Sequence, residues 1–110
     1  MAFDETLAAR IRVQLGKKKG LTEKKMFGGI GFLLNGNLAC AVRRDEMLVR
    51  IAPEKTDEAL AQKHTRMFDL SGTRPMKGWI LVNREGLKTD KALANWVDTG
   101  VSYASSLPPK

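Results

Sequence analysis

The sequence predicts an α+β fold in which an antiparallel sheet of five strands packs against helices, in the order α-β-β-β-α-β-β-α. Apolar residues recur at helical spacing near both ends of the chain, in residues 7–15 and 93–104. Between them, Asn35-Gly36 separates two apolar runs and is typical of a two-residue hairpin turn, which needs positive φ at both positions. A length of 110 residues fits one domain, covering residues 1–110.

The first helix is expected to begin after Asp4, whose carboxylate can accept hydrogen bonds from free backbone N–H groups of the first turn. Glu5 then lies where the helix dipole favours a negative charge. The apolar stripe of this helix consists of Leu7, Ile11 and Leu15. Gly16 and Gly20 bracket its end.

Three strands follow, joined by the Asn35-Gly36 turn and a second turn at Arg44-Asp45. The first turn predicts that Leu33 pairs with Leu38 and Phe32 with Ala39. The face expected under the helices then holds Leu33, Leu38, Val42, Met47 and Val49. The other face holds Ile30, Phe32 and Leu48.

That second face is too apolar to be left in water, so we expect something to cover it. One interpretation is a homodimer or another protein partner, with an interface at Ile30, Phe32, Leu48 and Arg50. The other is burial under loops or terminal segments of the same chain. The sequence leaves both interpretations open.

The rest of the chain predicts two helices and two strands. Thr56 can cap a short second helix, and residues 65–70 and 78–83 have the composition of strands with a loop between them. Trp79 alternates with Leu81, and we interpret it as a core residue. The last helix begins near Thr89, and its apolar side consists of Leu93, Trp96, Val97, Val101 and Ala104.

Several motifs occur in the order typical of one bacterial family. They are Met26-Phe27-Gly28-Gly29 before an apolar strand and Asn35-Gly36, then residues 71–79 (SGTRPMKGW), a helix around Trp96, and residues 107–110 (LPPK). In this the chain resembles the N-terminal domain of the TfoX/Sxy family, regulators of natural competence.

The resemblance implies a fold similar to that of secretion chaperones, which commonly pair into dimers. It also implies a role in transcriptional control of competence genes, alongside the cyclic-AMP receptor protein. The full regulators carry a second, helical domain that this sequence lacks, so we expect a stand-alone relative of the N-terminal domain.

The formal charge of +7 is concentrated in the first part of the chain. Residues 1–44 hold nine Lys and Arg against three Asp and Glu, whereas residues 45–110 hold ten against nine. The predicted nucleic-acid or anion contacts are Lys17, Lys18, Lys19, Lys24, Lys25, Arg43, Arg44, Arg74 and Lys77. The alternative is a solvated face that only aids solubility.

The sequence gives little support for an enzyme. Cys40 is the only cysteine and lies in an apolar strand, where a buried and inert thiol is the common case. His64 is the only histidine, so we expect no metal site and no cofactor. The chain contains no apolar run of membrane-spanning length and no signal-peptide pattern, so we expect a cytoplasmic protein without membrane contact.

We therefore expect a non-enzymatic regulatory or adaptor domain that contacts protein or DNA. The first alternative is a small anion- or metabolite-binding domain, with Arg50, Arg74 and Lys77 around a cleft at the sheet edge. The second alternative is an enzyme that uses Cys40 as its nucleophile.

Overall fold

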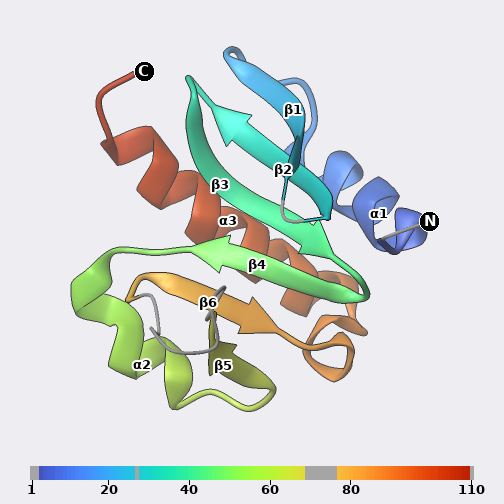
Figure 1. Cartoon of the computed structure of the whole chain (residues 1–110), viewed down its shortest axis with the longest axis vertical. Coiled ribbons are helices and arrows are strands. Elements are labelled where there is room, and N and C mark those ends of the chain that lie inside the picture. Colours follow the sequence, from blue (N-terminus) through green and yellow to red (C-terminus); the bar gives the residue numbers. More distant parts are fainter. Residues whose placement is uncertain (1–2, 27, 69–76, 110) are drawn as a thin grey trace.

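The computed structural model describes residues 3–26, 28–68 and 77–109. These residues form an antiparallel sheet with helices, as the sequence predicts (Figure 1). The longer elements are, in chain order, α1 (Glu5–Leu15), β1 (Leu21–Met26), β2 (Gly29–Leu34), β3 (Asn37–Arg43), β4 (Glu46–Arg50), α2 (Thr56–Leu60), β5 (Thr65–Met67), β6 (Trp79–Val82) and α3 (Asp90–Ser106). Two 3₁₀ turns, η1 (Pro53–Lys55) and η2 (Arg84–Leu87), precede α2 and α3.

The sheet has six strands in the order β1-β2-β3-β4-β6-β5, so the prediction of five strands was wrong. The missed strand is β1, which pairs antiparallel with β2 at one edge of the sheet. Its middle residues, from Thr22 to Lys25, are all exposed and polar. An edge strand of this kind has no apolar alternation, which is the pattern that reveals a strand in a sequence.

Helix α1 forms as predicted. The Asp4 carboxylate accepts hydrogen bonds from the backbone N–H groups of Thr6 and Leu7, at 2.9 and 3.1 Å. Leu7, Ile11 and Leu15 are buried, and the helix ends at Gly16, whose φ is +62°.

The β2–β3 hairpin has the predicted turn, because φ is +52° at Asn35 and +84° at Gly36. Leu33 pairs with Leu38, also as predicted. Beyond that pair, the observed register of β2 and β3 differs from the predicted one. Phe32 pairs with Cys40 instead of Ala39, so β3 contains one extra residue, a β-bulge, at this point.

The bulge changes which face several side chains occupy. The sequence predicts Ile30 and Phe32 on the face away from the helices, but Phe32 is fully buried in the helix-side core and Ile30 packs against it. Leu33 and Leu38, expected under the helices, belong to the cluster on the opposite face. One inserted residue inverts the alternation of side chains along the strand, which explains all four errors.

The turn at Arg44-Asp45 gives β3 and β4 the predicted register. Val42 pairs with Met47, and Cys40 pairs with Val49, with all four side chains in the core under the helices. Arg44 occupies this turn with φ +58°, and its carbonyl oxygen accepts a hydrogen bond from the Asp4 N–H. The turn between β3 and β4 is thereby tied to the start of α1.

Helix α3 runs behind the sheet (Figure 1) and packs mainly on β3 and β4. Leu93, Trp96 and Val97 are buried against the strands, as the helical spacing predicts. Gly100 allows the closest approach, because a Cβ atom there would lie 2.3 Å from the carbonyl oxygen of Ala39, the extra residue of the bulge. The Thr89 hydroxyl caps α3 by accepting from the Ala92 N–H.

The second face of the sheet is apolar, as predicted, and is largely covered within the single chain. Its buried residues are Leu38, Ala41, Leu48, Phe68 and Leu81, with Met26, Leu33 and Trp79 packed around them. Leu48 is 0% exposed. Among the large hydrophobic side chains of the described residues, only Val13 on α1 is exposed, at 77%. Burial by the chain itself therefore accounts for Leu48.

Near the β5 edge, α2 follows η1 directly, so Thr56 is the first residue of α2 and not its cap. Its buried hydroxyl donates to the Pro53 carbonyl and accepts from the Gly78 N–H, which joins α2 to the start of β6. Trp79 lies on the same face as Leu81, as predicted, and is half-buried. Of the predicted strand over residues 65–70, residues 69–70 lie outside the described residues.

Candidate nucleic-acid interface

Five of the predicted contact residues lie on and beside the edge strand β1. We call them the lysine surface: Lys17, Lys18, Lys19, Lys24 and Lys25. All five are exposed, and none of them makes an ion pair or side-chain hydrogen bond with another described residue. Unpaired ammonium groups at an exposed edge are available to phosphate oxygens.

The backbone around the lysine surface is fixed by hydrogen bonds. The Leu21 N–H donates to the Lys18 carbonyl at 3.2 Å, and the Asn35 N–H donates to the Gly20 carbonyl at 2.9 Å. These bonds hold the segment after α1 against the β2–β3 turn. The lysines therefore project from an ordered edge of the sheet.

Glu23 is the only carboxylate in residues 17–25, and an arginine on α1 balances its negative charge. Glu23 accepts two hydrogen bonds from the guanidinium of Arg12 on α1, both at 2.9 Å. The same hydrogen bonds raise the pKa of Arg12. The lysine surface thus carries positive charge that no acid on β1 cancels.

The other predicted basic contacts are not gathered with Lys17–Lys19. Arg43 and Arg44 lie at the opposite end of the sheet, where β3 turns into β4. The Arg43 guanidinium lies 5.8 Å from the Phe68 ring, over the second face of the sheet. Lys77 is exposed just before β6, four strands away from β1. Arg74 lies outside the described residues.

The predicted partner interface is not assembled as a surface. Phe32 and Leu48 are both 0% exposed, on opposite faces of the sheet. Ile30 lies on the helix side, and Arg50, the fourth predicted interface residue, is half-buried at the end of β4. A homodimer stays a prediction, but an exposed apolar face no longer supports it.

Cys40 does not have the surroundings of a nucleophile. It is 0% exposed in the core between β3 and the helices, and this burial raises its pKa to about 12. His64 is exposed in the turn before β5, with φ +70°. Within the described parts of the chain, no group of three His, Cys, Asp or Glu residues could hold a metal ion.

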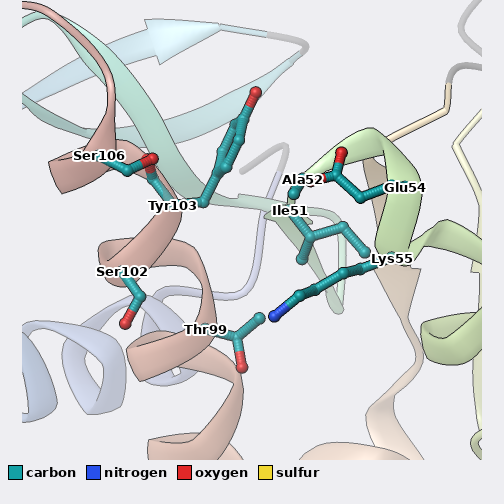
Figure 2. A pocket seen from close by; sticks show the side chains of 8 residues that line it. All are labelled: Ile51, Ala52, Glu54, Lys55, Thr99, Ser102, Tyr103 and Ser106. Atoms are coloured by element: carbon teal, nitrogen blue, oxygen red, sulfur yellow. The ribbon is translucent and has the colours of Figure 1, made fainter.

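A cavity of about 460 Å³ lies between the second half of α3 and the segment that leads from β4 into α2 (Figure 2). Its lining residues are Ile51, Ala52, Glu54, Lys55, Thr99, Ser102, Tyr103 and Ser106. Figure 2 shows the Lys55 side chain extending toward α3, with its ammonium group near Thr99. This cavity was not predicted from the sequence.

One signal in the sequence could have indicated one wall of the cavity. Thr99, Ser102, Tyr103 and Ser106 follow each other at helical spacing and place four hydroxyl groups on one side of α3. The other wall, with Lys55, is brought there only by the path of the chain after β4, which the sequence pattern does not reveal.

No helix of the described chain is long and apolar enough to span a membrane. No curated protein and no solved structure matches the chain. The TfoX N-terminal domain family, in contrast, matches residues 13–104, which includes the lysine surface, the bulged hairpin and nearly all of α3. The chain thus belongs to the TfoX N-terminal domain family.

Proposed function

We propose that this domain is a non-enzymatic regulatory domain that contacts DNA through the lysine surface. The observation that carries the proposal is the set of five exposed lysines on and beside β1 that pair with no other described residue, next to a carboxylate that is already paired with Arg12. Family membership adds the implied role in transcriptional control, which the resemblance to TfoX/Sxy regulators suggests.

The chemistry of such a contact is electrostatic. Lysines that bind phosphates displace condensed counterions from DNA, which gives affinity without reading the base sequence. The lysine surface lies on a strand and the segment before it, and not on a helix that could enter the major groove. We therefore expect binding to duplex DNA with little sequence preference.

The alternative is that the lysines only protect the exposed edge of β1. Lysine on an edge strand discourages pairing with the edge of another molecule, and it also increases solubility. Both interpretations require exposed lysines, so a binding measurement with matched variants is needed to separate them.

The test compares two triple variants that each remove three positive charges. One carries Lys17→Gln, Lys18→Gln and Lys19→Gln. The control carries Lys63→Gln, Arg84→Gln and Lys91→Gln, which are exposed, make no ion pair with another described residue and lie outside β1 and the segment before it. Fluorescence anisotropy with a labelled duplex of about 20 base pairs, at about 50 mM salt, gives the affinity of each.

We expect the first variant to bind at least about tenfold more weakly than the wild type, and the control to change about twofold or less. Equal weakening of both variants would show that net charge alone attracts the DNA. Absence of binding by the wild type would leave edge protection as the role of these lysines. Either result would overturn the proposal.

A further inference from the structure

The guanidinium group of Arg50 is held by aromatic rings from two other elements. Its Cζ atom lies 5.0 Å from the ring centroid of Trp79, on β6, and 5.5 Å from that of Tyr103, on α3. Arg50 itself is the last residue of β4 and is half-buried. Cation–π contacts on two sides restrict where this charge can move.

The N–H donors of Arg50 have no partner among the described residues, in either hydrogen bonds or ion pairs. Three other arginines of the chain differ in this respect. Arg10, Arg12 and Arg66 each meet a carboxylate, from Asp90, Glu23 and Glu46 respectively. Aromatic rings fix the position of the Arg50 guanidinium, and its N–H groups do not donate to any described residue. A planar guanidinium of this kind is suited to donate two parallel hydrogen bonds to two oxygens of one anion.

The cavity of Figure 2 lies next to this group, and Tyr103 contributes to both. Ile51 and Ala52, which follow Arg50 in the chain, line the same cavity. Its volume of about 460 Å³ lies in the range of small-molecule sites. Arg50 is therefore positioned at the margin of a space that a metabolite-sized ligand fits.

The cavity contains further donors. The Lys55 ammonium, the Ser102 hydroxyl and the Tyr103 hydroxyl make no hydrogen bond with the described residues. Thr99 and Ser106 differ, because their hydroxyl protons are donated to the carbonyls of Asn95 and Tyr103. These donors do not converge on one point, because Figure 2 shows the Tyr103 hydroxyl pointing away from the Lys55 ammonium and the Ser102 hydroxyl.

We propose that Arg50, positioned by the rings of Trp79 and Tyr103, binds the oxyanion of a small molecule, either a carboxylate or a phosphate, at the margin of this cavity. Arg50 takes two oxygens of the anion, and the cavity, with Lys55 and Ser102 on its walls, accepts the rest of the molecule. Glu54 also lines the cavity and opposes a bound anion by its negative charge. This site goes beyond the proposed function and shares no residue with the lysine surface.

The experiment is a titration of the ¹⁵N-labelled full chain, followed by NMR of the backbone amides. Inorganic phosphate is one titrant and acetate is the other, with chloride at the same ionic strength as the reference. We expect a saturable shift at Ile51, Ser102 and Tyr103 with at least one of the two anions. Comparing phosphate with acetate distinguishes the two sources of the oxyanion.

The variants test each donor. Arg50→Gln should weaken binding of phosphate or acetate about tenfold, as expected when a charged hydrogen-bond donor is lost, and Lys55→Gln should weaken it less. Tyr103→Phe keeps the ring against Arg50 and should weaken binding less. Glu54→Gln should strengthen it. Arg84→Gln, at an exposed arginine on η2, is the control and should leave the affinity unchanged.

Two results would overturn the proposal. In the first, phosphate and acetate give only the shifts that chloride gives. In the second, Arg50→Gln and Arg84→Gln titrate alike, which would mean that Arg50 only covers the aromatic rings. Neither result bears on DNA binding by the lysine surface, so the two proposals can fail separately.

Discussion

The thiol of Cys40 illustrates at the residue scale how burial decides chemistry. An apolar strand position predicts an inert cysteine, and the structure places Cys40 in the core with its pKa raised to about 12. A thiolate is the reactive form, and desolvation disfavours it. The sequence therefore anticipated the state of this residue, since a run of apolar neighbours already indicates burial.

We predict that the folded protein resists alkylation of Cys40. At about pH 8.5 an exposed cysteine is half ionised, whereas a thiol with a pKa of about 12 stays protonated. Iodoacetamide followed by mass spectrometry should show almost no labelling in buffer and complete labelling in guanidinium chloride. Rapid labelling of the native protein would contradict the burial of Cys40 and would reopen the alternative of a cysteine enzyme.

At the element scale, the β-bulge in β3 and the glycine in α3 belong together. Ala39, the inserted residue, is buried beneath α3, and its carbonyl oxygen lies where a side chain of residue 100 would be. The sequence predicts β3, α3 and the two turns that flank β3, because these depend on local spacing and on turn residues. It does not predict the bulge, because Ala39 is neither a glycine nor a break in the apolar run.

We predict that Gly100→Ala destabilises the protein although alanine is the better helix former. Its Cβ would lie 2.3 Å from the Ala39 carbonyl oxygen, so α3 or the bulge must shift. Urea unfolding should show a loss of about 2 kcal/mol, as is usual for overpacking. Ser105→Ala, at an exposed position of α3, is the control and should be neutral or slightly stabilising. A Gly100→Ala protein as stable as the control would contradict the close packing of α3 on β3.

Two features of the structure, β1 and the cavity beside α3, could not be predicted from the sequence for the same physical reason. Strand β1 is polar along its middle, and the cavity beside α3 depends on the path of the chain between β4 and α2. Neither feature leaves an apolar period in the sequence. The five predicted contact lysines are exposed, but the separation of Lys17–Lys19 from Arg43 and Arg44 follows from the sheet topology alone.

At the scale of the whole molecule, the apolar side chains of the described residues are mostly buried within the chain, and charged side chains are exposed. The sheet is covered on the helix side by α1 and α3, and on the second face by a smaller cluster around Leu48. What the described surface offers to a partner is therefore mainly charge, with the lysine surface at one edge and Arg50 on β4, three strands away. A domain of this kind is suited to bind anions.

The most direct test of this account is the salt dependence of DNA binding by the wild-type domain. If all five lysines contact phosphates, the logarithm of the association constant should fall linearly with the logarithm of the salt concentration, with a slope of about −4.5. Replacing Lys17, Lys18 and Lys19 by glutamine should reduce the slope to about −1.8. The same slope for both proteins, or no binding at low salt, would contradict the assignment of the lysine surface as the DNA contact.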